Sequence, residues 1–494
     1  MKVYAVVGVP PEIQAYAMAK YSRSAQSMLE SIGELSAQRA EQFLETFYFQ
    51  YGHRSIADLA HLVLAVEDVS ILAATRVVDE PLWDGQERST RYQPFKKTGY
   101  FTPPELAGPT AERYQQAADA LFSAYDVLTA DLLALLVDTV PRPADLEPKA
   151  FERTLRARAF DVTRSILPLA TITSLGQVVS ARVLERQICR LLSDPYPEVR
   201  AVGEALRQAC LEPAAAPHGN GQAESVRAAP TLVKYTQPSS YLIETRRELA
   251  ALALGELANL GEPDRARPVG LADDESPLDE AIATLLYRAS VEGHSYRQLQ
   301  AHVRAMPGRR KLEILDLAAG HRGSHDELLR ELQVGYAFKF DVLVDYGSFR
   351  DLHRHRRCVQ IIQTPIPTHG VDSADLVFPL AFGRQVAAKA LEARLGHRYE
   401  CALASGLAAA RELGPSAPLS APYLLPMATR TRALFKMDAA EAIYITELRT
   451  GAAGHFSYRR IGWQMYEAFR ARAPELAALA NPTNPAEVFD LLRR

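Results

Sequence analysis

The chain has 494 residues, of which 48% are hydrophobic and 23% charged, and its formal net charge is -3. This length predicts two or three domains, and the composition is typical of a globular protein in water. The near-neutral charge argues against nucleic-acid binding and against an acidic disordered chain. Four scattered cysteines form no Cys-x-x-Cys pair, which argues against a disulfide framework and against a structural zinc site.

The first residues contain no long apolar core followed by a cleavage site, so we predict no signal peptide. We also find no run of about 18 apolar residues, the length that a membrane span requires. We therefore expect a cytoplasmic protein that does not cross a membrane.

The first predicted elements are a strand at 61–68 and a helix that follows Ser70, a plausible N-cap. A similar pair comes later, with a strand at 337–347 and a helix capped by Ser348. Long helices rich in Ala and Leu follow each pair. This order predicts an α+β fold, helix-rich with a small, mainly antiparallel sheet in each half.

Residues 213–230 are rich in Ala, Pro and Gly and have no apolar period, which is typical of a linker. We therefore predict an N-terminal domain at 1–212 and a C-terminal domain at 231–494. A second polar, proline-containing stretch at 260–277 predicts a long loop inside the second domain.

Two sequence echoes link these halves. GHRSIAD at 52–58 is matched by GHRGSHD at 320–326, and ILPLATIT at 166–173 by LLPMATRT at 424–431. Both echoes occur in the same order and at a similar separation, which indicates an internal duplication.

The stretch from Gln86 to Tyr92 could bind a phosphorylated ligand. If this stretch is extended, Glu87, Ser89 and Arg91 share one face, because side chains alternate along a strand. Arginine grips phosphate with two donors, and a carboxylate accepts a hydroxyl or amide proton. The alternative is a solvated polar loop.

Residues 353–357 read His-Arg-His-Arg-Arg, between apolar runs. Such a concentrated positive patch favours an anion, either a nucleotide phosphate or a reduced flavin. A surface charge run is the plainer interpretation. Nucleic acid is disfavoured because no aromatic residues interleave with the cluster.

These residues resemble the flavin-dependent thymidylate synthase (ThyX) family. In this family, seven residues separate Arg-His-Arg from a Ser, and that Ser belongs to a closing Glu-x-Ser-x-Arg-Tyr. Residues 354–356 match Arg-His-Arg, with Thr364 at the Ser position. Residues 87–92 match the end of the pattern, whereas 78–80, near the expected Arg-His-Arg position, are Val, Asp and Glu. Each half therefore holds one part of the signature.

The downstream motifs are divided in the same way. Arg164 before Leu-Pro-Leu resembles the family's arginine there, whereas Pro422 stands at that place in the second half. Arg449 in Glu-Leu-Arg resembles the family's closing Leu-Arg. The family's Asn-Ala-Arg is replaced by Ser-Ala-Arg at 180–182 and Asp-Ala-Ala at 438–440.

In this family each nucleotide site lies between two subunits, which supply different motifs. The second half keeps one subunit's set, Arg354 and Arg449. The first half keeps the partner's set, namely Glu87, Ser89, Arg91 and Arg164. The resemblance therefore implies two tandem thymidylate-synthase-complementing modules that retain one composite site.

The resemblance implies reductive methylation of deoxyuridine monophosphate (dUMP) to dTMP, with FAD as cofactor and methylenetetrahydrofolate and NADPH as co-substrates. Arg449 would be the catalytic residue, stabilising negative charge that develops on the uracil ring. Arg354 and Arg91 would hold the phosphate or uracil end, while Arg164, Ser89 and Glu87 would complete the substrate site.

The resemblance also places residues at the cofactor. His355 and Arg356 would face the flavin, where positive charge favours its reduced anion. Arg354 and Arg182 would be further flavin contacts, and His53 and Ser55 would lie near the flavin or folate. Plainer interpretations are a solvated helix face for Arg182, a core histidine for His53, and a helix-end cation for Arg449.

Two other functions remain open. The altered Asn-Ala-Arg elements, and Asp351 where the family has Gln, are compatible with a nucleotide-binding paralogue that has lost catalysis. His321, His325 and Asp326 form His-x-x-x-His-Asp, which could belong to a metal-dependent phosphohydrolase. Family members are homotetramers, so a tandem chain is expected to form a homodimer; a closed pseudo-dimeric monomer is the alternative.

Overall fold

The computed structural model describes residues 8–20, 32, 54–95, 99–212, 227–323 and 326–492. The chain divides into two compact units. Unit 1 comprises Met1–Val69, Ala73–Arg88 and Thr173–Ile243, and unit 2 comprises Ser70–Leu72, Ser89–Ile172 and Glu244–Arg494. Each unit draws on both sides of the predicted linker, so the domain boundaries at 212 and 231 stay a prediction about the duplication.

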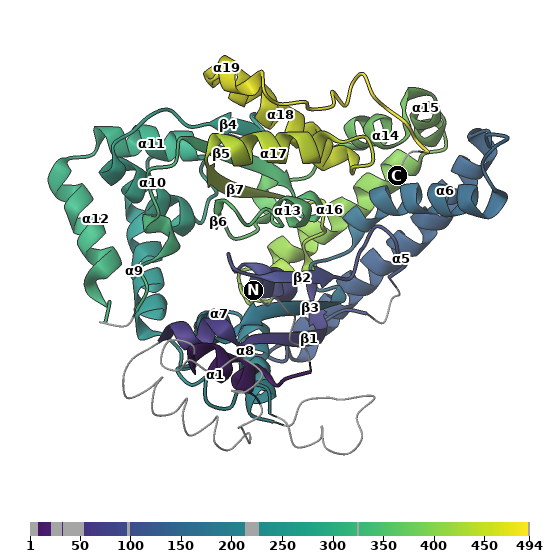
Figure 1. The fold of residues 1–494 in the computed structure, drawn as a ribbon. Helices are drawn as coiled ribbons and strands as arrows, with labels where there is room; N and C mark the ends of the chain where they lie inside the picture. Colours follow the sequence, from purple (N-terminus) through teal and green to yellow (C-terminus); the bar gives the residue numbers. More distant parts are fainter. Residues whose placement is uncertain are drawn as a thin grey trace. The chain divides into compact units, whose positions relative to one another are not determined.

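The elements before the predicted linker start with a short N-terminal helix (Figure 1). They are α1 (Pro11–Lys20), η2 (Arg54–Leu59), β1 (His61–Ser70), α4 (Ile71–Val78), β2 (Asp84–Glu87), α5 (Gly108–Thr139), α6 (Pro148–Thr163), η3 (Arg164–Ile166), β3 (Ile172–Ser180), α7 (Ala181–Leu192) and α8 (Pro197–Leu211).

The later elements begin with a helical segment that precedes the second sheet. They are α9 (Ser240–Glu256), β4 (Val269–Leu271), α10 (Pro277–Ala289), α11 (Tyr296–Ala305), α12 (Gly308–Gly320), η5 (Arg330–Leu332), β5 (Phe338–Asp345), α13 (Tyr346–Leu352), β6 (Val359–Ile362), η6 (Pro367–His369), α14 (Ala374–Phe382), α15 (Arg384–Glu392), α16 (Leu395–Leu413), η7 (Ala421–Leu424), β7 (Arg430–Met437), α17 (Ala439–Thr450), α18 (Phe456–Arg472) and α19 (Pro474–Ala477).

The two sheets repeat one topology. The first has the order β1-β3-β2, and the second has β4-β5-β7-β6. If β4 is set aside, each sheet places the third strand of its half between the other two. In both halves a strand leads directly into a helix, as β1 into α4 and β5 into α13. This repetition confirms the predicted α+β class and the tandem duplication.

Within unit 2 the Leu-Pro echoes pair with each other. The amide of Leu169 donates to the carbonyl of Leu425 at 2.9 Å, and the equivalent amide of Met427 donates to Leu167 at 2.8 Å. Such reciprocal bonding is the signature of a two-fold interface, in which each partner uses the same surface. The duplicated segments therefore meet as subunits of a symmetric dimer do.

Strand β5 carries different chemistry on its two faces. Phe338, Phe340, Val342 and Val344 belong to one buried apolar cluster with residues of α17 and α18. Phe338 meets Phe469 of α18 edge to face, with ring centroids 4.9 Å apart. Because side chains alternate along a strand, the intervening polar residues face the other side.

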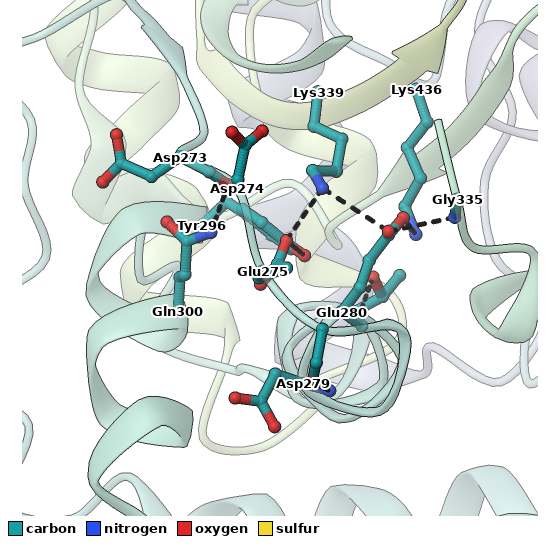
Figure 2. Close-up of polar contacts among 12 residues, drawn as sticks. Asp273, Asp274, Glu275, Asp279, Glu280, Tyr296, Gln300, Gly335, Lys339 and Lys436 are labelled. Carbon is teal, nitrogen blue, oxygen red and sulfur yellow. Dashed lines mark hydrogen bonds and ion pairs between the residues drawn. The ribbon is translucent and has the colours of Figure 1, made fainter. Parts of the chain in front are cut away.

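An ion network lies on that other side (Figure 2). Lys339 of β5 lies 3.1 Å from Glu275 and 3.4 Å from Glu280, and Lys436 of β7 lies 2.9 Å from Glu280. The hydroxyl of Tyr296 donates to Glu275 at 2.8 Å. Buried charges need such partners, and this network ties α10 and α11 to the sheet.

The predicted strand–helix pairs at 61–78 and 337–352 are present, but the second cap was wrong. Asp345, not Ser348, is the N-cap of α13, and its carboxylate accepts from the amide of Ser348. Ser348 lies in the first turn. The helix starts earlier than expected because the last strand residue itself supplies the acceptor that the first turn needs.

Among the described helices, α5 is long and apolar enough to cross a membrane by length and composition. The sequence prediction had found no such stretch. The buried residues of α5 form one stripe that includes Leu121, Tyr125, Leu128 and Leu132, and the helix packs against α16 and α6 in unit 2. One such helix is weak evidence, because core helices pass the same test. Localisation stays a prediction.

Candidate active site

The sequence left open whether the stretch after β2 is extended through Arg91, and the structure shows that it is not. The strand ends at Glu87, and residues 90–92 form a turn. The hydroxyl of Ser89 accepts from the amide of Arg91 at 3.2 Å, a local bond that competes with a strand ladder. The turn directs Arg91 into unit 2, whereas Glu87 belongs to unit 1.

Arg91 is buried against an acid of α6. Its Nε donates to Asp161 Oδ1 at 2.8 Å and its Nη2 to Oδ2 at 3.4 Å, which is the forked geometry of an arginine–carboxylate pair. Burial alone would lower the pKa of Arg91, but Asp161 outweighs burial and raises it. Asp161 also lies 3.6 Å from Arg158, one turn earlier on the same helix.

Arg164, the first residue of η3, is only 3% exposed. Its Nη1 lies 3.4 Å from the hydroxyl of Thr90, so it reaches the loop that carries Arg91. Its Nη2 lies 3.5 Å from Asp351, which stands just before the Arg-His-Arg sequence of the second half. Arg164 thus lies where the motifs of the two halves meet.

The second half contributes a triad of which His355 and Glu441 are buried. Nδ1 of His355 lies 3.1 Å from Glu441, and Nε of Arg449 donates to Nε2 of His355 at 2.8 Å. Burial lowers the pKa of His355. The ring is therefore neutral at pH 7, donating to Glu441 and accepting from Arg449. Arg449 is held by this ring rather than by the carbonyls that end its helix.

Tyr458 of α18 joins the two sets of cations. The guanidinium carbon of Arg449 lies 5.4 Å from the ring centroid of Tyr458, and that of Arg91 lies 6.0 Å from it. The phenol oxygen also accepts from Arg91 at 3.4 Å. An arginine from each half therefore contacts the same ring, which is 6% exposed.

His455, the N-cap of α18, supports the other side of this cluster. Its Nε2 lies 2.9 Å from the carbonyl of Asp161, and its Nδ1 accepts from the amide of Ser457. Burial, with a further contribution from Arg164, lowers the pKa of His455 well below its ordinary value. A neutral His455 fixes the backbone beside Asp161 without adding charge.

We call this group the composite cluster. Its members are Arg91, Arg158, Asp161, Arg164, Asp351, His355, Glu441, Arg449, His455 and Tyr458. It holds four guanidinium groups and three carboxylates around neutral histidines. A residual positive charge among forked donors suits a phosphate or a ring that develops negative charge.

The other predicted residues of the second half lie at the edge of this cluster. Arg354 is exposed and Arg356 half-buried, on either side of the buried His355. Both nitrogens of His355 are engaged within the protein, so its proposed contact with flavin stays a prediction. Ser89 is half-buried in the loop that carries Arg91.

The predicted cofactor residues of the first half belong to unit 1. Arg182 is half-exposed and pairs with Asp58 at 2.9 Å. Ser55 is exposed in η2, and His53 lies outside the described residues. The assignment of these residues to flavin or folate stays a prediction.

The altered Asn-Ala-Arg elements have a structural reason. Ser180 is the N-cap of α7 and accepts from the amide of Val183, and Asp438 is the N-cap of α17 and accepts from the amide of Glu441. Asn, Asp and Ser are about equally good caps. The first position of the motif therefore keeps its capping role in both halves although the residue differs.

Sequence reasoning missed Asp161, Tyr458, Glu441 and His455. A signal for Asp161 was present, because it lies three residues after Arg158 and three before Arg164, on one face of a helix. Tyr458 and Glu441 carry no such signal, since only the packing of α17 and α18 brings them to the cluster.

The predicted metal motif is only partly described. His325 lies outside the described residues, and His321 lies 3.0 Å from Glu248 in an ion pair. Within the described ranges, no group of three or more His, Cys, Asp or Glu residues could hold a metal ion.

One known family matches most of this chain. The family described as thymidylate synthase complementing protein matches residues 8–214 and 335–475, more than two thirds of the chain. The chain belongs to this family. Its two matched segments fall on either side of the predicted linker, and thymidylate-synthase-like modules therefore occur twice in one polypeptide.

Three relatives match nearly the whole of this chain. A UPF0159 protein of Chlamydia muridarum is 25% identical over 94% of this chain and 88% of its own length. One of Chlamydia pneumoniae is 26% identical over 93% and 87%, and one of Thermoplasma acidophilum 23% identical over 94% and 93%.

A similarity to a solved structure is much weaker. A UMP/dUMP methylase, PolB from Streptomyces cacaoi bound with 5-Br dUMP, is 16% identical, with a TM-score of 0.27 over 40% of this chain and 84% of that one. A TM-score of this size does not establish a shared fold.

Proposed function

We propose that this member of the thymidylate synthase complementing family binds dUMP at the composite cluster and methylates it reductively to dTMP. The observation that carries the proposal is the meeting of Arg91 and Arg449 on Tyr458. The family's motifs, divided between the halves, predict that these two arginines serve one site.

Each cation has a distinct role in this proposal. Arg91, Arg164 and Arg354 bind the phosphate or the uracil end, because guanidinium groups match phosphate oxygens with paired donors. Arg449 stabilises negative charge that develops on the uracil ring, and its bond to His355 fixes its direction beforehand. Ser89 and Glu87 complete the substrate site.

The residues beside the cluster fit an anionic cofactor. Arg354 and Arg356 flank His355 on the side of the protein that solvent reaches, and Arg182 is half-exposed in unit 1. Arg354 and Arg356 would hold a phosphate of FAD beside His355, and the family resemblance assigns Arg182, His53 and Ser55 to the same cofactor. FAD, when bound, supplies reducing equivalents drawn from NADPH for the one-carbon unit of methylenetetrahydrofolate.

A second candidate is a nucleotide-binding protein without catalysis. It is favoured by the second-half element, where Ala440 replaces the arginine of Asn-Ala-Arg, and by the ion pair that engages Arg182. Both observations weaken the flavin site and leave the nucleotide site unchanged.

The test combines an absorbance spectrum of the purified protein with release of tritium from dUMP labelled at C5. The synthase predicts a flavin spectrum and tritium release, and Arg449→Ala should reduce turnover about 100-fold or more. Arg398→Ala, which breaks a surface pair with Asp131, is the matched control.

Full turnover in Arg449→Ala would contradict the role of this arginine. A colourless protein that binds dUMP but releases no tritium would favour the second candidate.

A further inference from the structure

Asp351 places a carboxylate beside Arg164 in the composite cluster. It lies in the last turn of α13, 3.5 Å from Arg164, and the exposed fractions of the two side chains are 21% and 4%. Neither Asp351 Oδ2 nor Arg164 Nη2 forms a hydrogen bond, although both atoms are buried. The pair therefore acts through charge rather than through a directional bond.

The other two carboxylates of the cluster have positioning roles. Asp161 accepts two hydrogen bonds from the guanidinium group of Arg91, and Glu441 accepts a hydrogen bond from Nδ1 of His355. Asp351 also contributes to the electrostatic environment that raises the pKa of Arg91. Its carboxylate thus opposes two of the guanidinium groups that bind phosphate in the proposed function.

We propose that Asp351 is a specificity-determining residue that limits how much negative charge the site accepts. The inference rests on the proposed function. The four arginines of the cluster and Arg354 face three carboxylates, one of which is Asp351. The net charge of about two positive units matches the roughly two negative charges of a monophosphate but falls short of those of a diphosphate. A neutral residue at position 351 raises the net positive charge of the cluster, which favours ligands with more phosphate groups.

A purely structural role for Asp351 predicts a different pattern. If Asp351 only anchored Arg164, replacing Asp351 would misplace that arginine, and phosphorylated ligands would bind more weakly. If Asp351 acts through charge, its neutralisation raises affinity in proportion to ligand charge and leaves an uncharged nucleoside unaffected. The dependence on ligand charge therefore separates the two roles.

The experiment measures dissociation constants of deoxyuridine, dUMP and deoxyuridine diphosphate by calorimetry for the full chain, Asp351→Asn and Asp351→Gln. Wild-type protein should bind the monophosphate more tightly than the diphosphate. In both variants we expect no change for deoxyuridine, about tenfold tighter binding of dUMP, and a gain at least as large for the diphosphate.

Asp131→Asn is the control, because it removes a carboxylate from an exposed pair with Arg398. It should leave all three constants unchanged. Three results would overturn the role of Asp351. They are equal changes in affinity for all three ligands, weaker binding of dUMP and the diphosphate in the variants, and a wild-type protein that prefers the diphosphate. If dUMP binds neither wild type nor any variant, the proposed function fails, and this inference fails with it.

Discussion

Tyr458 is the residue that arginines from both halves contact. Its ring receives Arg449 and Arg91, and its hydroxyl accepts from Arg91. Cation–π contacts of this kind contribute about 0.5 to 2 kcal/mol each, more when the groups are shielded from water. The ring therefore positions both arginines without neutralising either.

Replacing Tyr458 should separate these two contributions. Tyr458→Phe removes one hydroxyl and should weaken dUMP binding about threefold, whereas Tyr458→Leu removes the ring and should weaken it at least about tenfold. Calorimetric titration measures both constants.

Tyr466→Leu is the control on the same helix, since Arg470 lies 5.7 Å from that ring centroid outside the cluster. It should leave affinity unchanged. If Tyr458→Leu bound dUMP with wild-type affinity, the ring of Tyr458 would have no role in binding.

Motifs revealed the cations of the site but not what holds them. Arg91, Arg164 and Arg449 were predicted because each stands in a short pattern with fixed spacing. Tyr458 and Glu441 could not be predicted, because their contacts depend on how α17 and α18 pack. Sequence spacing encodes neighbours on one element, whereas contacts between distant elements require the fold.

At the scale of elements, the ion network beneath β5 and β7 buries the charged side chains of Lys339, Lys436 and Glu280. Burial opposes ionisation of Glu280, but Lys436 and the amide of Gly335 outweigh burial and lower the pKa of Glu280 below 4.5. A carboxyl whose pKa is lowered in the folded state stabilises the fold when the pH is above its pKa in the unfolded state. This stability is lost as the pH falls through its pKa in the folded state.

Glu280→Gln should therefore lower the free energy of unfolding at pH 7 by about 3 kcal/mol, because it leaves Lys436 buried without its partner charge. Below pH 4.5 the wild type should lose stability more steeply than the variant. Urea denaturation across this range measures both effects.

Glu152→Gln, in an exposed pair with Arg156, should change stability by less than about 1 kcal/mol. If Glu280→Gln changed stability as little as this control, the network would not stabilise the sheet.

The predicted strand–helix pairs were confirmed because apolar alternation is a local signal, although the predicted cap of the second helix was wrong. The sequence left open whether residues 87–91 are extended. The strand ends at Glu87, and the Ser89 hydroxyl accepts from the backbone amide of Arg91, two residues on. The ion network was not predicted, since Lys339 and Lys436 face Glu280 only after β5 and β7 pair in register.

At the scale of the whole molecule, the reciprocal bonds between Leu167–Leu169 and Leu425–Met427 make one chain resemble a symmetric dimer. The order of strands in the two sheets repeats as well. In the proposed function, the two copies diverged after duplication, and one composite site kept both sets of motifs. The sequence echoes predicted this duplication, whereas the compact units, which mix both halves, could not be read from them.

Family members are expected to assemble from four modules, and two copies of this two-module chain would supply them. We expect a homodimer with about twice the 54.5 kDa mass of the chain. Light scattering coupled to size-exclusion chromatography measures this mass. A monomer at micromolar concentration would show that the internal pairing suffices.

The central claim is that arginines from both halves serve one nucleotide site, and a double-mutant cycle on dUMP affinity tests it directly. Arg91→Ala and Arg449→Ala, confirmed as folded by circular dichroism, should each weaken binding at least about tenfold, because each loses a charged contact. The double variant should lose less than the product of the two effects, since both arginines share Tyr458 and the ligand. Wild-type affinity in either single variant, or strictly multiplicative losses, would contradict the account.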